Sequence, residues 1–230
     1  MEKQDIAKFG EYLELITMIG KGDMVLFRGQ RIDDALLPKI ARADPTRNTT
    51  QIEKKMLAEL RRRGTLHIDT RHGDAWDLLV LAQHYGMATR LLDWTSNPLV
   101  ALWFACLTAK RGKSFYVYVL LSEEEFLLNK SETPDPFKVG KTRVFRPNLN
   151  NPRIVAQGGW FTAHRYSLKV KKFVPLEKNP ELKDALFQIK IPPHIRKDVL
   201  VHLDILGINY QSMYPDLEGV CRQLNWLHDT

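Results

Sequence analysis

Residues 97–121 constrain the fold of this chain more than any other segment. After Asn97 and Pro98 the sequence continues LVALWFACLTA, so apolar side chains occupy nearly every side of the helix predicted there. A helix that is hydrophobic all round is buried, and we expect this one at the centre of the fold, ending at Lys110-Arg111-Gly112. A buried strand, SFYVYVLL over 114–121, follows directly. The rest of the chain must therefore pack around this helix and strand.

Strands and helices follow one another irregularly on both sides of this centre. Apolar and alternating patterns predict strands at 24–29, 89–95, 165–171 and 186–191. Start and stop signals predict helices from Thr50 to about Arg63, from Asp74 to Gly86, around 199–207, and from Pro215-Asp216 onward. Because the order is not a regular β-α-β alternation, the pattern favours an α+β fold. We expect a single domain over 1–230, with an irregular basic and proline-rich loop at 130–153.

Finer features give more detailed predictions for the helices. Thr50 with Glu53, and Ser122 with Glu125, have the spacing of capping boxes. Inward-facing apolar side chains are predicted on three helices, at Ile52, Met56, Leu57 and Leu60, at Val199, Leu200, Leu203 and Leu206, and at Leu217, Val220, Leu224 and Leu227. The only two cysteines, Cys106 and Cys221, lie within apolar helical patterns and are predicted to be core residues rather than a disulfide or a metal pair.

Composition limits the possible functions. With 44% hydrophobic and 27% charged residues the 230-residue chain has the composition of a globular protein. No segment approaches about 20 consecutive apolar residues, so we expect no membrane span, and the start MEKQDIAKFG lacks a signal core, so we expect a cytoplasmic protein. The net charge of +7 is compatible with nucleic acid, an anionic ligand or a basic surface. The chain has no phosphate-binding loop of the G-x-x-x-x-G-K type, no G-x-S-x-G, no H-E-x-x-H and no Cys/His cluster, so we predict no metal site.

Polar residues interrupt the apolar stretch QHYGMATRLLDWTSNPLVALWFA at 83–105. A strand that ends at the start of a helix delivers free backbone N–H groups and the helix dipole to one point, which favours an anion. Trp94 would supply an aromatic wall at that point, and Thr95 and Ser96 would supply hydroxyl donors. The alternative is that Arg90 and Asp93 form a buried pair and that Ser96 or Asn97 only caps the helix.

Two further segments place polar groups beside apolar strands. In Phe27-Arg28-Gly29-Gln30 the glycine would let the backbone and the guanidinium of Arg28 approach a ligand together, and a guanidinium binds phosphate through two parallel hydrogen bonds. The alternative is that Arg28 pairs with a core carboxylate such as Asp93. In NPRIVAQGGWFT at 151–162, Gln157 precedes two glycines and either faces a cavity or closes a bulge.

Together these segments resemble the FRG domain family, named for its Phe-Arg-Gly motif. The residues that carry the resemblance lie between about 20 and 220: Phe27-Arg28-Gly29-Gln30 with Leu37-Pro38, the stretch at 83–105, NPRIVAQGGWFT, Leu206-Gly-Ile-Asn209 and Tyr214-Pro-Asp-Leu-Glu-Gly219. FRG domains occur in bacteria and phages, and their layout is similar to that of ADP-ribosyltransferases. The resemblance therefore implies a central mixed or antiparallel sheet packed by helices, and NAD as the ligand.

The same resemblance assigns roles to individual residues. It implies that Arg28 holds NAD, that Thr95 and Ser96 take the Ser/Thr role before the apolar helix, and that the third role, a glutamate in ADP-ribosyltransferases, falls on or near Gln157. An amide stabilises developing positive charge less well than a carboxylate does, and Glu218, His84 and Asp93 are further candidates. The predicted catalytic residues are Arg28, His84, Thr95 and Gln157, and the predicted NAD-binding residues are Arg28, Gly29, Gln30, Tyr85, Arg90, Asp93, Trp94 and Ser96.

Three functions are open at this point. The first is an NAD-dependent ADP-ribosyltransferase or NAD glycohydrolase in bacterial or phage defence or toxin biology, with an unidentified protein or nucleic-acid target. The second is a non-catalytic module that binds nucleotide or nucleic acid through the basic residues from Lys138 to Arg146. The third is an interaction with a partner protein without a ligand.

Overall fold

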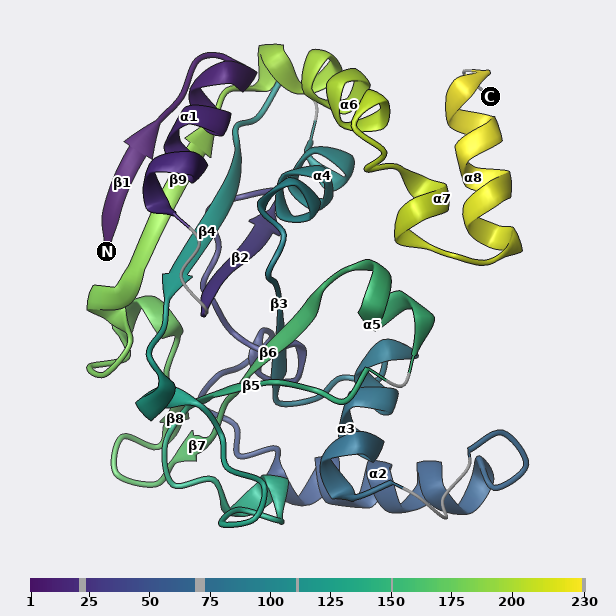
Figure 1. Ribbon diagram of the computed structural model, residues 1–230. Helices are drawn as coiled ribbons and strands as arrows, with labels where there is room; N and C mark the ends of the chain where they lie inside the picture. Colours follow the sequence, from purple (N-terminus) through teal and green to yellow (C-terminus); the bar gives the residue numbers. More distant parts are fainter. Residues whose placement is uncertain (21–23, 69–72, 111, 150, 229–230) are drawn as a thin grey trace.

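The computed structural model describes residues 1–20, 24–68, 73–110, 112–149 and 151–228, and in this part of the chain a seven-stranded sheet forms the centre of the fold (Figure 1). Across the sheet the strands are β1 (Glu2–Asp5), β9 (Leu186–Ile191), β4 (Phe115–Leu121), β2 (Val25–Gln30), β3 (Leu91–Thr95), β6 (Gly159–Ala163) and β5 (Arg143–Phe145). Strand β1 runs parallel to β9, whereas the other neighbours are antiparallel. The fold is therefore α+β with a mixed central sheet, as predicted.

The apolar helix at the centre, α4 (Pro98–Thr108), packs against β2 and β4. It shares one core with α1 (Phe9–Ile19) and α6 (Arg196–Ile205). Strand β4 supplies alternate residues to the two faces of the sheet: Phe115, Val117 and Val119 to this core, and Tyr118 and Leu120 to the opposite one. The predicted start at Asn97 and Pro98 is confirmed, but the helix ends at Thr108, before Lys110, and Arg111 lies outside the described residues.

A second group of helices borders the other end of the sheet. Helices α2 (Thr50–Arg63) and α3 (Ala75–His84) pack against β3, β5 and β6 in a separate core that contains Leu57, Trp76 and Phe161. The predicted ends of α3 are confirmed, since Asp74 caps its start and Gly86 follows its end with a φ of 87°. The short helices α5 (Pro152–Ala156) and α7 (Tyr210–Met213), with α8 (Leu217–Leu227), complete the fold, and α8 lies at its edge (Figure 1).

The two predicted capping boxes, Thr50 with Glu53 and Ser122 with Glu125, are both wrong. Helix α2 is preceded by Thr49, and Glu53 is fully buried in a pair with Arg90 instead of bonding back to the start of the helix. Because Glu53 points inward, Ile52 points outward and is 38% exposed. At 122–125 the chain forms a single turn of 3₁₀-helix, η2 (Glu124–Phe126), which has no side-chain cap.

The predictions for two segments of the second half are only partly correct. The segment 130–153, predicted as a loop, contains the edge strand β5. This strand pairs with β6, and the pairing buries Val144 and Phe145. The segment also contains a 3₁₀ turn, η3 (Pro136–Lys138), and the start of α5, while Asn150 lies outside the described residues. The predicted strand at 165–171 is wrong: only β7 (Tyr166–Ser167) pairs with β8 (Lys172–Phe173), across a turn in which Lys171 has a φ of 49°.

Most of the inward face predicted for the last helix is also wrong, although Val220 is half-buried. Leu217, Leu224 and Leu227 on α8 are exposed, as is Cys221, which is therefore not a core residue. Gln223 points inward instead, because its amide group accepts from the N–H of Tyr210 and donates to Asp204. Leu206 after α6 is exposed as well, whereas Cys106 is buried as predicted.

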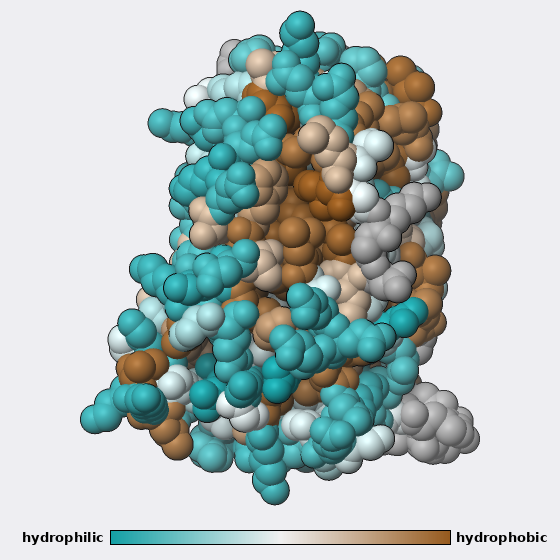
Figure 2. Space-filling view, turned by 60° about the vertical axis from the view of Figure 1, so that its left-hand side comes forward, coloured by the Kyte–Doolittle hydropathy of each residue, from teal (hydrophilic) through white to brown (hydrophobic). Residues whose placement is uncertain are grey.

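The surface carries both apolar and polar areas. Figure 2 shows hydrophobic residues gathered in a hollow in the middle of one face, with hydrophilic residues over most of the area below and to the upper left. Across the residues that the structure describes, no helix combines the length and the apolar character needed to span a membrane.

Candidate functional site

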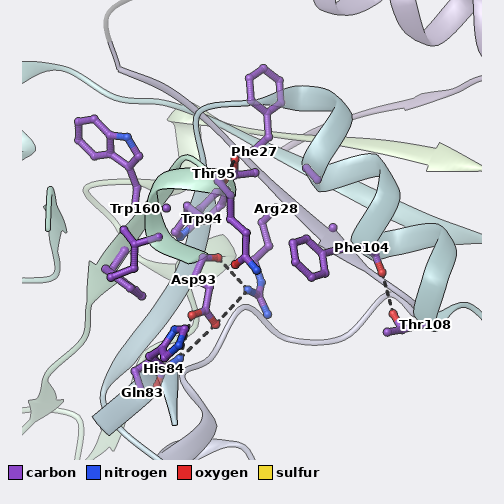
Figure 3. A pocket seen from close by; sticks show the side chains of 16 residues that line it. Phe27, Arg28, Gln83, His84, Asp93, Trp94, Thr95, Phe104, Thr108 and Trp160 are labelled. Atoms are coloured by element: carbon purple, nitrogen blue, oxygen red, sulfur yellow. Dashed lines mark hydrogen bonds and ion pairs between the residues drawn. The ribbon is translucent and has the colours of Figure 1, made fainter. Parts of the chain in front are cut away.

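A cavity opens where strands β2 and β3 separate. The two strands are paired only at Phe27 and Thr95, although β2 continues to Gln30 and β3 begins at Leu91. Beyond that pair the side chain of Arg28 takes the place of backbone pairing, since its Nη1 donates to the carbonyl oxygen of Asp93 at 2.7 Å. The resulting cavity has a volume of about 320 Å³ (Figure 3). Ligand sites in proteins commonly measure about 300–1,000 Å³.

Aromatic and apolar side chains form most of the cavity wall, and polar side chains line the rest of it. The apolar and aromatic lining residues are Phe27, Trp94, Ala101, Phe104, Ile154, Trp160 and Phe161, and the polar side chains are Arg28, Gln83, His84, Asp93, Thr95, Thr108 and Gln157. Sequence reasoning missed Phe104, Trp160 and Gln83. Trp160 follows the Gly-Gly pair, and Gln83 opens the interrupted apolar stretch, so both lay next to a recognised signal. Phe104 gave no such signal, because it lies within a helix whose pattern indicates core.

Arg28 lies at the point where the strands separate and is held on two sides. Its Nε donates to Oε1 of Gln30 at 3.2 Å, and its Nη1 lies 3.8 Å from Oδ2 of Asp93 in addition to bonding the Asp93 carbonyl. Burial lowers the pKa of Arg28 to about 10, although the charge of Asp93 opposes this shift. Arg28 is thus positively charged at neutral pH while its side chain is only 13% exposed. Such a charge strongly favours an anionic ligand.

Close packing against α4 explains why residue 29 is a glycine, and the sequence did not reveal this. A Cβ atom at this position would overlap the carbonyl oxygen of Ala101 and lie 2.6 Å from the backbone nitrogen of Ala105. The glycine therefore lets β2 and α4 pack backbone to backbone. Gly29 also lines the cavity, so the approach of its backbone and the Arg28 guanidinium to a ligand stays a prediction.

Asp93 supplies the carboxylate among the lining side chains of the described cavity. Its two oxygens accept from Nε2 of Gln83 at 3.0 and 3.1 Å, and Gln83 in turn accepts from the hydroxyl of Thr89 at 2.6 Å. The carboxylate is 55% exposed, so it remains accessible from the cavity. Figure 3 shows the Asp93 side chain between the guanidinium of Arg28 and Gln83.

His84 lines the cavity at the end of α3. Partial burial lowers the pKa of His84, and the positive charge of Arg153 lowers that pKa further. The imidazole is therefore mostly neutral at pH 7 and is able to accept a proton. Its neighbour Tyr85 stacks edge-on against it but is exposed and lies outside the cavity lining.

Thr95 lines the cavity, but its hydroxyl already has two partners. It donates to the carbonyl oxygen of Gln157 at 2.6 Å and accepts from the backbone N–H of Asn97 at 3.0 Å. It therefore connects β3, α4 and α5 rather than offering a donor to a ligand.

The anion site predicted at the start of α4 does not form. The side chain of Asn97 accepts from the N–H groups of Leu99 and Val100, and the N–H of Ser96 donates to Gly158. Pro98 has no N–H group to offer. The backbone donors at this helix end are thus used within the protein, and Ser96 is not among the residues that line the cavity.

Gln157 reaches the cavity from the end of α5. Its Nε2 donates to the carbonyl oxygen of Met213 at 3.0 Å, which connects α5 to α7. The following Gly158 has a φ of 54°, and a Cβ there would lie 2.9 Å from Oγ of Ser96. Glu218, the other acidic candidate in this half of the chain, pairs with Arg153 and Arg222 and does not line the cavity.

Arg90 lies away from the cavity in a buried ion pair. Its Nε is 2.9 Å from Oε2 of Glu53, and Oε1 of Glu53 accepts from the backbone N–H of Arg90. The pairing of Arg90 with Asp93 that the sequence suggested is therefore wrong. Because Arg90 is 1% exposed, the structure does not bring it to the other candidates.

A second lobe adjoins the first cavity and has a volume of about 350 Å³. Arg28, Gly29 and Thr108 line both spaces, so Arg28 stands at their junction. The second lobe is lined in addition by Gln30, Arg31, Ile32, Asp34, Ala35 and Arg42. Gln30, which we predicted to bind the ligand, thus belongs to the second lobe.

Comparison with known protein families identifies the segment that builds most of this site. Residues 23–114 match the model of the FRG domain. The FRG match contains β2, α2, α3, β3 and α4, and therefore Arg28, His84, Asp93 and Thr95, while Gln157 and Trp160 lie beyond it. Comparisons with curated proteins and with solved structures gave no match. The FRG resemblance thus has support, and the structure brings Arg28, His84, Thr95 and Gln157 to one cavity together with Gly29, Asp93 and Trp94.

Proposed function

We propose that the cavity binds NAD and that the protein cleaves the bond between nicotinamide and ribose, as an ADP-ribosyltransferase or an NAD glycohydrolase. One observation carries this proposal. The charged guanidinium of Arg28 and the accessible carboxylate of Asp93 lie 3.8 Å apart in a cavity walled by aromatic rings. NAD combines the same features, namely planar rings, a cationic nicotinamide ring and an anionic diphosphate.

The residues present fit such a ligand. Phe104 and Trp160 line the cavity and are partly exposed, so they offer aromatic surfaces to a planar ring. Trp94 also belongs to the lining, but its ring is buried in the core and its N–H group donates to Thr162. Among the described residues, Nη2 of Arg28 has no hydrogen-bond partner, whereas Nε and Nη1 do. The fixed guanidinium therefore presents one free edge to an anionic group of the ligand.

Asp93 takes the role of the carboxylate in this scheme. When the bond between nicotinamide and ribose breaks, the nicotinamide nitrogen takes the electron pair and positive charge develops on the ribose. A nearby carboxylate stabilises that charge, and removing one such preorganised group typically costs about 100- to 1,000-fold in rate. Gln157 is a neutral amide whose N–H group is bonded to Met213. We therefore assign the charge-stabilising role to Asp93 instead of Gln157.

His84 completes the set as a proton acceptor. In hydrolysis the oxygen of water bonds to the ribose carbon while nicotinamide leaves, and one proton must be taken up. In transfer, the same proton comes from the acceptor group of the target. His84 lines the cavity and is mostly neutral at pH 7, so it is suited to take this proton.

Release of nicotinamide from NAD, measured by chromatography, tests this function. We expect release by the wild type, loss of release in Arg28→Ala and a fall of at least about 100-fold in Asp93→Asn. Arg61→Ala and Asp184→Asn are matched controls, because both residues are exposed and lie outside the cavity lining. A wild-type protein that neither binds nor cleaves NAD would exclude the proposal. The resemblance to FRG domains extends it to a role in bacterial or phage defence, which infection of cells carrying the Asp93→Asn variant tests.

A second function is favoured by the aromatic wall and the charge outside it. The guanidinium of Arg146 lies 5.4 Å from the ring centre of Trp160, and the chain carries a net charge of +7. Bases of single-stranded nucleic acid stack on aromatic rings beside basic residues. Binding of a labelled single strand that weakens steeply with salt, without nicotinamide release, would support this non-catalytic alternative.

A further inference from the structure

The second lobe contains more positive charge than the structure neutralises. Three arginines line it, Arg28, Arg31 and Arg42, against the single carboxylate of Asp34. Asp34 is exposed, and its Oδ1 accepts from the N–H of Ala35. Within the described residues, neither Arg31 nor Arg42 forms an ion pair. This lobe therefore attracts anions more strongly than the aromatic one.

Arg28 and Arg42 are each held by the inner nitrogen of the guanidinium. Nε of Arg28 donates to Gln30, and Nε of Arg42 donates to the carbonyl oxygen of Leu37 at 3.0 Å. No hydrogen-bond partner is found in the described part of the chain for Nη2 of Arg28 or for either Nη of Arg42. Both groups are thus oriented by the protein while their outer nitrogens stay available in the same lobe.

The two guanidinium groups are also close enough to affect one another. After burial, the positive charge of Arg42 is a further cause of the lowered pKa of Arg28. Like charges held near each other repel, and a bound anion relieves this repulsion while accepting hydrogen bonds from both. Because Arg28 lines both lobes, an anion bound to it can continue from the aromatic lobe into the basic one.

We propose that the second lobe is a diphosphate site in which Arg42 acts together with Arg28, and that Arg42 makes the protein select a dinucleotide over a mononucleotide. This site rests on the proposed NAD binding only for what occupies the aromatic lobe. One end of the ligand lies against Phe104 in the aromatic lobe, its first phosphate contacts Arg28, and its second phosphate contacts Arg42. A mononucleotide such as nicotinamide mononucleotide supplies only the first phosphate and leaves Arg42 without a ligand.

Calorimetric binding of three probes, at one ionic strength, tests this assignment. NAD carries both the nicotinamide end and the diphosphate, nicotinamide mononucleotide lacks the second phosphate, and ADP lacks the nicotinamide end. We expect Arg42→Gln to lower the affinity for NAD and for ADP by about 10- to 100-fold, which corresponds to the loss of one hydrogen bond to a charged group. Affinity for nicotinamide mononucleotide should change by less than about 3-fold, because Arg42 does not contact it.

Two further variants guard against a general loss of structure. Arg47→Gln removes an exposed arginine near Arg42 that lines neither lobe, and it should leave all three affinities unchanged. Arg42→Lys keeps the charge but not the planar fork of donors, and it should give intermediate affinities for NAD and ADP. In turnover, Arg42→Gln should raise the KM for NAD while kcat stays within about 3-fold, since the contact is made equally before and during the reaction.

The outcomes separate this site from the proposed reaction. ADP binding that depends on Arg42, without any nicotinamide release from NAD, would support the diphosphate site and reject the reaction. Nicotinamide release with equal losses for NAD and nicotinamide mononucleotide in Arg42→Gln would support the reaction and overturn the site. Absence of measurable binding of all three probes would overturn the site as well.

Discussion

Two arginine–carboxylate pairs meet at strand β3, and they differ in almost every physical respect. Arg90, directly before β3, pairs with Glu53 on α2, and Asp93 within β3 pairs with Arg28 on β2. Arg90 and Glu53 are 1% and 0% exposed, with their charged atoms 2.9 Å apart, and the backbone N–H of Arg90 bonds the same carboxylate. Arg28 and Asp93 are 3.8 Å apart, and Asp93 is 55% exposed. The first pair is saturated by protein contacts, whereas the second keeps bonding capacity for something else. Proximity of opposite charges is therefore a poor sign of function, and unused bonding capacity at a cavity is a better one.

The largest effect that tests this comparison is expected from the buried pair. Glu53→Ala leaves the charge of Arg90 buried without a partner, which should lower the free energy of unfolding by about 3–5 kcal/mol. Urea denaturation followed by circular dichroism measures this change. Replacing both partners, as in the double variant Glu53→Leu with Arg90→Met, should lower it much less, because no buried charge remains. A loss below about 1 kcal/mol in Glu53→Ala would show that the pair does not stabilise the fold.

The local sequence could not have identified the partner of Arg90. Asp93 is its nearest carboxylate along the chain, but residues three apart on an extended strand point to opposite faces. The real partner, Glu53, lies on α2, and the Thr50/Glu53 spacing suggested a capping role for it instead. Arg90 is buried because helix α2 covers the start of β3, and the same helix brings the Glu53 carboxylate to it. Which helix covers which strand depends on the tertiary fold and cannot be read from the local sequence.

The fold was more accessible to sequence reasoning than the site. The cap at Asn97, the proline after it and the apolar run of α4 were sufficient to predict the central helix. The second lobe was missed because Arg42 lies after a short 3₁₀ turn, where no periodicity reveals which way a side chain points. The predicted anion site failed for a foreseeable reason, since a residue that caps a helix uses the N–H groups that an anion would need.

A pH-dependent effect of intermediate size on stability is expected from His164, which lies close enough to Arg28 and Arg90 to be affected by their charges. Burial lowers the pKa of His164 to about 3, and the charges of Arg28 and Arg90 add to that shift. In the unfolded chain His164 has its ordinary pKa near 6.5 and takes up a proton below that pH, whereas in the folded protein it stays neutral down to about pH 3. Falling pH therefore favours the unfolded chain. The folded state should lose about 2–3 kcal/mol between pH 6.5 and pH 4.5 from this residue.

Urea denaturation across this pH range measures the contribution of His164. His164→Leu should show a clearly shallower loss of stability with falling pH than the wild type. His194→Gln, which changes an exposed histidine, should keep the wild-type slope. Equal slopes in His164→Leu and the wild type would show that His164 does not stay neutral in the folded protein.

A smaller effect is expected at Gly29, next to the cavity arginine. Gly29→Ala forces β2 away from α4, because the new methyl group meets the backbone of Ala101 and Ala105. Overpacking of this kind costs about 1–3 kcal/mol. Gly10→Ala on α1 is the matched control, since nothing lies within 4 Å of its added Cβ, and it should be neutral or slightly stabilising. If Gly29→Ala unfolds at the same urea concentration as the wild type, then the contact between β2 and α4 is looser than the geometry indicates.

The smallest effect on stability should come from Asp93, the carboxylate of the open pair. Asp93→Asn keeps an acceptor for Gln83 and removes a half-exposed charge, so the free energy of unfolding should change by less than about 1 kcal/mol. The same variant should nevertheless lose at least about 100-fold in nicotinamide release. Urea denaturation and the release assay on one preparation measure both quantities, and Asp184→Asn should change neither. A variant that loses stability and keeps activity would reverse the comparison, because Asp93 would then serve the fold as Glu53 does.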